Sequence, residues 1–328
     1  MRYNRLDNML DLKQTILDKI KQNGGWVNCH SHIDRSFTID EKLYKLANKL
    51  RHQKWLLNTD LRETSTAEQI YDRMAASLEL MIAQGVSAIG SFIDVDPHMK
   101  DKAIKAAQKI KQKYQGQITI KFINHSSYGI LTKKEQDWFE VGADFADIIG
   151  GMVKANQGQE SEYLDILMQT AKAKGKMIHV HVDEENVLSE KETELLAKKT
   201  IEHGLQGKVV GIHGISINCH PKSYREELYQ LMKKARLMMI ACPISWLNSR
   251  RSEELTPTHN PTTPVDELLD AGIPVGIGTD NIADLFMPYN DGSLWNDLRV
   301  LMEMNRLYDI DQLVKIATSS GRKILGID

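Results

Sequence analysis

The sequence predicts an α/β protein, a (β/α)8 TIM barrel, from two observations. Apolar, β-branched runs recur eight times along the 328 residues, and longer stretches with helical periodicity follow them. Several runs come directly after a glycine that ends a helix, as in AQGVSAIG, AKGKMIHV and DAGIPVGIG. Alternating β and α units predict a parallel sheet with helices outside, and because eight units can close a ring, a barrel is favoured over an open doubly wound sheet.

The predicted elements alternate regularly along the chain. The strands are expected at Trp26–Asp34, Val86–Asp94, Ile118–His125, Asp147–Ala155, Met177–Glu184, Val209–Ser216, Leu237–Pro243 and Ile273–Asn281. The amphipathic helices between them are expected at Thr66–Gln84, Pro97–Tyr114, Glu160–Lys174, Ser189–His203, Ser223–Lys234 and Val265–Ala271. Further helices are expected near Leu6–Gln22, Leu294–Asn305 and Ile310–Leu325.

The organisation of the chain points to a single domain. The sequence contains no Pro- or Ser-rich linker, no low-complexity tract and no obvious sequence repeat. We therefore expect one barrel domain over residues 1–328, with a helical extension at 1–25 and C-terminal helices at 294–328.

Composition and charge exclude several classes of protein. Lys and Arg total 42 against 44 Asp and Glu, a net charge of −2, which argues against a nucleic-acid partner. No apolar run approaches the roughly 20 residues that span a membrane, and the N-terminal stretch lacks the apolar core of a secretory signal. Cys29, Cys219 and Cys242 are never in CxxC spacing, so neither a disulfide framework nor a thiolate zinc site is indicated. We expect a cytoplasmic enzyme without a membrane partner, and the sequence leaves its oligomeric state open, a homo-oligomer included.

Polar residues gather at the ends of four predicted strands. In barrels of this kind the active site is built from the carboxyl ends of the strands and the loops that follow them. The segments CHSHID, HVHVDE, GIHGIS and GIGTDN place five of the 11 histidines and several carboxylates at such ends. The side chains concerned are His30, His32, His179, His181, Asp183, Glu184, His213, Asp280 and Asn281.

This pattern favours a metal site. His30 and His32 are two residues apart, so on a strand both imidazoles point to one face and can chelate one divalent ion. The alternative for an isolated HxH pair is two histidines bonded to backbone groups, but His181, His213 and Asp280 at other strand ends favour the metal.

Other polar residues keep two interpretations. His179 lies deeper in its strand and is expected to be a buried, hydrogen-bonded core histidine. Glu184 either leans over the barrel mouth or is a solvated loop charge. Arg35 could contact a substrate, although loop charges usually do not. Lys154, at the end of the fourth strand, could be carboxylated and bridge two metals. His125 and His220 are expected to be solvated or capping residues.

Taken together, the strand-end motifs resemble the amidohydrolase superfamily, and HVDE resembles its cytosine deaminase-like branch. The resemblance covers about residues 26–322. It implies that one metal is bound by His30, His32, His181 and Asp280. It further implies that His213 and Asp280 handle the proton of the attacking water and that Glu184 is the acid/base toward the substrate nitrogen.

The sequence also departs from this family. Family members usually carry a small β-sandwich formed by both chain ends, but here the N-terminal stretch is helical and the chain stops at GRKILGID, so we expect a barrel without that sandwich. Asn124 stands near the position of a substrate-reading glutamine, and Asn281 replaces a second aspartate. We expect Asn124, Asn281 and Phe286 to contact the substrate, with contacts to the ring that differ from those to cytosine.

The expected function is hydrolytic. One divalent ion, Zn²⁺ or Fe²⁺, suits the imidazole and carboxylate set and lowers the pKa of its water from about 16 to about 7, which makes hydroxide available. The small-molecule substrate is expected to be an aminated nitrogen heterocycle that undergoes deamination. The alternatives are an amide or cyclic-amide hydrolase with two metals bridged by Lys154, a non-catalytic barrel that binds a ligand, and a flavin or phosphate barrel. GIGTDN lacks the glycine-rich loop that the last of these needs.

Overall fold

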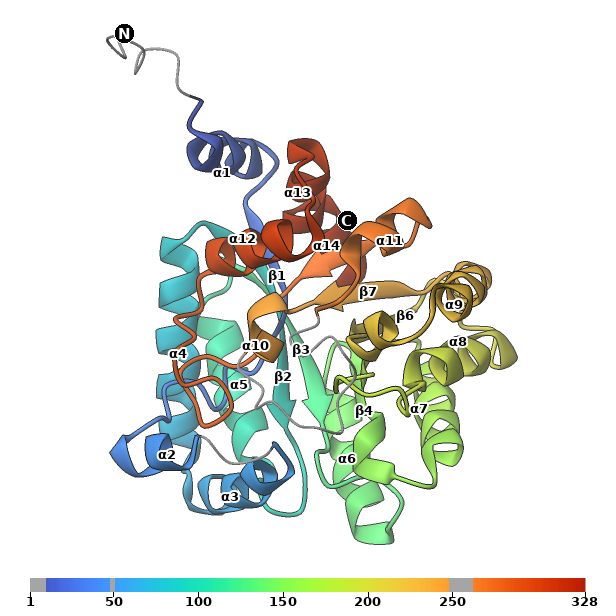
Figure 1. The fold of residues 1–328 in the computed structure, drawn as a ribbon. Coiled ribbons are helices and arrows are strands. Elements are labelled where there is room, and N and C mark those ends of the chain that lie inside the picture. Colours follow the sequence, from blue (N-terminus) through green and yellow to red (C-terminus); the bar gives the residue numbers. More distant parts are fainter. Residues whose placement is uncertain (1–9, 48–50, 248–261, 328) are drawn as a thin grey trace, which may run out of the picture.

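The computed structural model describes residues 10–47, 51–247 and 262–327, and Figure 1 shows how helices surround the strands. All neighbouring strands in these residues pair in parallel. They form a three-stranded sheet of order β1-β2-β3 and a five-stranded sheet of order β4-β5-β6-β7-β8. The strands are β1 (Trp26–Ser31), β2 (Val86–Asp94), β3 (Thr119–His125), β4 (Ile149–Met152), β5 (Ile178–Val182), β6 (Val209–His213), β7 (Met238–Ala241) and β8 (Val275–Ile277).

Two isolated parallel bridges join these sheets into a ring. Ile123 after the middle of β3 pairs with Ile148, which precedes β4, and Ser31 at the end of β1 pairs with Asp280, which follows β8. At the second junction the backbone N–H of Asp280 donates to the carbonyl of His30 at 3.0 Å. The described strands all belong to this ring, so the (β/α)8 barrel is confirmed and this part of the chain holds no flanking β-sandwich.

Helices follow the strands and cover the outside of the ring. In chain order, with short 3-10 turns labelled η, they are α1 (Leu12–Gln22), α2 (Glu41–Leu46), α3 (Arg51–Thr64), α4 (Ala67–Ala83), α5 (Lys102–Lys113), α6 (Lys133–Phe145), η1 (Val153–Asn156), α7 (Glu160–Lys174), α8 (Glu192–Glu202), η2 (Ser216–Cys219), α9 (Lys222–Ala235), α10 (Pro243–Leu247), α11 (Val265–Asp270), α12 (Leu294–Asn305), α13 (Ile310–Ala317) and α14 (Ser319–Ile324). None of the helices in the described ranges is both long and apolar enough to cross a membrane.

Local sequence signals explain several helix boundaries. A capping box formed by Thr66 and Gln69 starts α4 one residue after the predicted start, and α7 has the predicted bounds, ending at Gly175 with φ +66°. Helix α6 is absent from the predicted set, although the capping box of Thr132 and Glu135 marks its start. Helices α2 and α3, inserted between β1 and β2, were not predicted either.

Other boundaries differ from prediction. The single helix expected at Ile310–Leu325 is two helices, because Thr318 adopts a non-helical backbone (φ −132°, ψ −93°). Helix α1 begins at Leu12 after its N-cap Asp11, and residues 6–9 of the predicted helix lie outside the described residues. Strands β1, β4 and β8 are shorter than expected, so His32, Lys154, Asp280 and Asn281 lie in segments that follow strands.

Apolar side chains fill much of the barrel interior, and the polar groups of the candidate site gather toward one end. One buried cluster includes strand residues such as Val27, Cys29, Phe92 and Ile212. Ile324, at the end of α14, packs into the same cluster. The C-terminal helix thus helps to fill the ring beside the first residues of the strands, and the polar site occupies the carboxyl ends.

The junction between β1 and β8 predicts a sensitive position. A Cβ at Gly278 would lie 2.7 Å from Cβ of His30 and 2.8 Å from its carbonyl oxygen. Gly278→Ala should therefore push β8 away from β1 and lower the free energy of unfolding by about 1–3 kcal/mol. Urea unfolding measures this loss, and an unchanged unfolding midpoint would contradict the close packing of this junction.

Candidate active site

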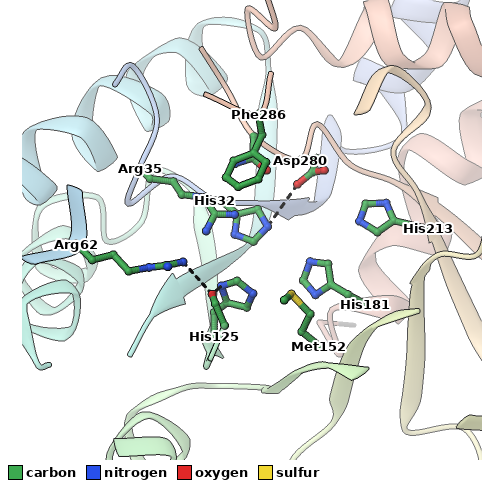
Figure 2. Close-up of a pocket in the computed structure, with 11 residues that line it drawn as sticks. His32, Arg35, Arg62, His125, Met152, His181, His213, Asp280 and Phe286 are labelled. Atoms are coloured by element: carbon green, nitrogen blue, oxygen red, sulfur yellow. Dashed lines mark hydrogen bonds and ion pairs between the residues drawn. The ribbon is translucent and has the colours of Figure 1, made fainter. Parts of the chain in front are cut away.

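Four histidines and one aspartate predicted at strand ends meet at the carboxyl end of the barrel; Figure 2 shows all but His30. His30 and His181 lie within β1 and β5, and His213 ends β6. His32 directly follows β1, and Asp280 lies three residues after the end of β8. All five residues are buried. Because parallel strands end on the same side of a ring, four segments far apart in the sequence deliver their polar groups to one place.

The distances within this group suit a shared ion. Nε2 of His30 and Nε2 of His32 lie 3.2 and 3.4 Å from Oδ1 of Asp280. Possible ligand atoms of His30, His32 and His181 all lie within 4.8 Å of one another, and so do those of His30, His213 and Asp280. Imidazole nitrogens with a carboxylate oxygen are the donors that Zn²⁺ and Fe²⁺ accept in proteins.

A hydrogen bond orients His181 toward this group. Its Nδ1 lies 3.0 Å from the carbonyl oxygen of Gly151 on β4. Since a carbonyl only accepts, Nδ1 carries the proton and Nε2 keeps its lone pair. The contrast with His179 is clear, because Nε2 of His179 donates to the carbonyl of Ile324 at 3.0 Å. Burial lowers the pKa of His179 to about 3, so it is the neutral, hydrogen-bonded core histidine that the sequence predicts.

Two of these residues adopt unusual backbone conformations. His213 has φ +77° and Asp280 has φ +58°, values that residues other than glycine rarely adopt. Hydrogen bonds hold both positions: the carbonyl of His213 accepts from Oγ1 of Thr263, and Nδ2 of Asn290 donates to the carbonyls on either side of Asp280, at Thr279 and Asn281. Such strain at the ends of strands, sustained by neighbouring bonds, is common at functional sites.

Burial sets the charge state of the group. Burial lowers the pKa of His32 well below its usual range, and the positive charge of Arg35 acts in the same direction. The pKa of His181 is lowered mainly by burial as well. Burial acts to raise the pKa of Asp280, but its contacts with His30 and His32 outweigh burial and hold the pKa well below its usual range. His32 and His181 are therefore held in the neutral form and Asp280 in the ionised form, the protonation states that metal binding requires.

The HVDE segment divides its carboxylates between two roles. Asp183 is a structural residue: its Oδ1 and Oδ2 accept from the backbone N–H groups of Glu192 and Thr193 at the start of α8, at 2.7 and 3.1 Å. Glu184 is fully buried, which rules out a solvated loop charge. It is the second residue after β5, and it is not among the residues that line the pocket.

Lys154 interacts with carboxylates and not with the group of histidines, as far as the described residues show. It belongs to η1 rather than to the end of a strand. Its Nζ pairs with Glu185 and, at 2.9 Å, with Oε1 of Glu190, and it does not line the pocket. A carboxylated lysine would lose both ion pairs, so this arrangement gives no support to a metal bridge at Lys154.

Some predicted substrate contacts lie in the pocket and one does not. Asn281 and Phe286 line it, together with His32, His181, His213 and Asp280. Asn124 does not: its Oδ1 accepts from the backbone N–H of Gly150 at 3.0 Å, which ties β3 to β4. The glutamine-like position therefore has a structural partner in this chain.

His125 and His220 were expected to be solvated or capping residues. Neither is solvated, because both are buried. His125 is buried, lines the pocket and pairs through Nδ1 with Oδ1 of Asp94 at 2.7 Å. His220 is buried as well, and its Nε2 bonds to the carbonyl of Glu190 at 3.0 Å. Position after a strand was a usable signal for His125, because the carboxyl ends of all strands face the site.

The pocket has basic residues that sequence reasoning weighed little or missed. Arg35, which follows the HxH motif, is buried and lines the pocket. Arg62 also lines it and comes from α3, one of the unpredicted helices. No local pattern around Arg62 distinguishes it from a surface arginine, so only the placement of α3 reveals it. Ser127 and Met152 complete the lining.

Comparisons with known proteins agree with this architecture. The chain is 48% identical over 261 residues to an uncharacterized protein of Haemophilus influenzae, covering 78% of this chain and 95% of that protein. It is 27% identical over 333 residues to the N-isopropylammelide isopropyl amidohydrolase of Pseudomonas sp. strain ADP, covering 97% of this chain and 79% of the enzyme. The crystal structure of 5-methylcytosine deaminase from Klebsiella pneumoniae superposes with a TM-score of 0.84 at 20% identity, covering 92% of this chain and 74% of that one.

The family comparison covers nearly the whole chain. The model of the amidohydrolase family matches residues 25–328, a range that includes all eight strands and every residue of the histidine and aspartate group. The chain belongs to the amidohydrolase family.

Proposed function

We propose that this protein is a metal-dependent hydrolase that releases ammonia from an aminated nitrogen heterocycle. The proposal is based on four buried imidazoles and one buried carboxylate that come together from four strand ends. Their possible ligand atoms form two overlapping groups, and within each group these atoms lie within 4.8 Å of one another. The names of two similar proteins, an N-isopropylammelide amidohydrolase and a 5-methylcytosine deaminase, support the substrate class, since both refer to substituted nitrogen heterocycles.

The proposed ligands of a single Zn²⁺ or Fe²⁺ are His30, His32, His181 and Asp280. The residues fit an ion because both nitrogens of His30 and Nδ1 of His32 are buried without a hydrogen-bond partner among the described residues. Buried polar atoms normally have partners, so a ligand for these nitrogens is expected. When bound, the ion supplies a water whose pKa is near neutrality.

The remaining steps belong to side chains of this chain. Asp280, which its neighbours keep ionised, accepts the proton of the attacking water. His213 faces the same space and stabilises the negative charge that develops on the substrate. Glu184, buried after β5, delivers a proton to the leaving nitrogen. We propose one ion rather than two, because Lys154 is held by Glu185 and Glu190.

The direct test combines ammonia release with elemental analysis. The purified protein, loaded with zinc or iron, is assayed on aminated pyrimidines, purines, pterins and triazines. We expect one metal per chain and ammonia from at least one of these classes. Release of ammonia from none of them by metal-loaded protein would refute the proposed reaction.

His30→Ala tests the metal site itself. His30 belongs to both groups of candidate ligands, so its loss removes one donor from each group. Bound metal and turnover should both fall by orders of magnitude, as measured by elemental analysis and the ammonia assay. Full activity of metal-free His30→Ala protein would contradict the metal dependence.

His179 and His181 provide a matched pair on one strand. His181→Asn should abolish metal binding. His179→Asn should keep the metal and lower the free energy of unfolding by about 1–3 kcal/mol, because the carbonyl of Ile324 loses its buried partner. Metal content and urea unfolding of both variants check this. The reverse result, metal lost only with His179, would show that the roles are exchanged.

Glu184→Gln separates proton transfer from metal binding. The amide keeps the shape of the side chain but cannot donate the proton that the leaving nitrogen needs. Metal content should stay near that of the wild type while kcat falls by about 10²–10⁴-fold. A fully active variant, or one that loses its metal, would remove Glu184 from the proposed role.

A further inference from the structure

The wall of the pocket beside the candidate ligands is organised around one carboxylate, Asp94 at the end of β2. Its Oδ2 accepts from Nε of Arg62 at 2.7 Å, and its Oδ1 pairs with Nδ1 of His125 at 2.7 Å. Nη1 of Arg35 approaches the same Oδ1 at 3.5 Å. Arg35, Arg62 and His125 all line the pocket, and Figure 2 shows the three side chains on one side of it.

His125 offers a hydrogen-bond acceptor to the pocket. The carboxylate of Asp94 accepts a hydrogen bond from Nδ1 of His125. The proton of the neutral imidazole is therefore on Nδ1, and Nε2 carries the lone pair. Nε2 is buried and has no hydrogen-bond partner among the described residues. His125 is 3% exposed, so this acceptor is built into the wall rather than solvated.

Arg35 offers a donor beside it. Its side chain is 9% exposed, and its Nε is buried without a hydrogen bond in the described part of the chain. Its ion pairs with Asp94 and Asp284 are long, at 3.5 and 3.8 Å, and its guanidinium lies 5.6 Å from the ring centre of Phe286. The guanidinium is therefore held in place with donor capacity that the protein does not use.

Arg62 differs from Arg35 in this respect. Its Nε bonds to Asp94, its Nη1 to the hydroxyl of Tyr128 at 3.2 Å and its Nη2 to Oγ of Ser127 at 2.9 Å. All three nitrogens of this guanidinium have partners within the protein. Arg62 is thus a positioning residue that holds Asp94, and through Asp94 it holds His125.

We propose that Arg35 and His125 form a subsite that recognises a ring carbonyl and the ring N–H next to it. Arg35 donates to the carbonyl oxygen, and Nε2 of His125 accepts from the N–H. The inference rests on the proposed function and narrows its substrate class to amino heterocycles that also carry an oxo group. A neutral carbonyl is favoured over a substrate carboxylate because Asp94 and Asp284 already lie beside the charge of Arg35.

Three pairs of compounds test the subsite, each differing only in the carbonyl with its N–H. They are cytosine and 4-aminopyrimidine, guanine and 2-aminopurine, and pterin and 2-aminopteridine. For at least one pair, the metal-loaded wild type should prefer the oxo compound by at least about 10-fold in kcat/KM, because the other compound leaves buried polar groups unpaired.

Variants then assign the preference to its residues. Arg35→Met and His125→Phe should bring the ratio of the two kcat/KM values to about one, with metal content unchanged. His125→Gln, which restores an acceptor, should recover part of the ratio. Arg299→Met, the same change at an exposed arginine of α12, is the control and should keep the wild-type ratio. An unchanged preference in Arg35→Met and His125→Phe would overturn the subsite, and metal loss in His125→Phe would make His125 a ligand instead.

A failure of the proposed function is distinguishable from a failure of the subsite. If the wild type releases ammonia from none of the six compounds, calorimetry of the same compounds with zinc-loaded protein decides. Tighter binding of the oxo compound, lost in Arg35→Met, would support the subsite although the reaction is different. Equal binding within each pair, or no binding at all, would overturn it.

Discussion

The hydrogen bond from the backbone N–H of Asp280 to the carbonyl of His30 is the contact on which the site depends most. It joins the segment after β8 to β1 and closes the ring of parallel strands. The same contact brings the carboxylate of Asp280 to within 3.4 Å of the imidazoles of both His30 and His32. Asp280 therefore takes part both in closing the barrel and in forming the candidate metal site. Asp280 has a left-handed backbone conformation at this contact, with φ +58°.

Two buried carboxylates organise the two sides of the pocket. Asp280 contacts His30 and His32 on one side. On the other side, Asp94 contacts Arg62, Arg35 and His125. Burial acts to raise the pKa of each carboxylate, yet cationic or hydrogen-bonding neighbours hold both pKa values well below the usual range. Each side of the pocket thus contains a buried negative charge that its partners stabilise. Such groups keep fixed positions, which a site that must orient a planar ring requires.

Neighbouring residues of one strand show how finely the roles divide. Along β5 and the two residues that follow it, His179 bonds to α14, His181 faces the candidate metal site and Asp183 caps α8. The first and third of these tie the strand to two different helices, α14 and α8. His181 is thereby held between two anchored positions. Support of this kind fixes the position of a buried imidazole in the absence of its ligand.

The alternation of strands and helices and the polar ends of four strands could be predicted from the sequence, because hydrophobic periodicity and glycine-terminated helices are local signals. His30, His181, His213 and Asp280 could be found in this way, since strand direction alone places them at one end of the ring. Three features became visible only in the folded chain. Lys154 pairs with Glu185 and Glu190, Asn124 binds the backbone of Gly150, and Arg62 reaches the pocket from an inserted helix. These outcomes depend on partners 26 or more residues away along the chain, or on the path of a long loop, and local patterns carry no information about such contacts.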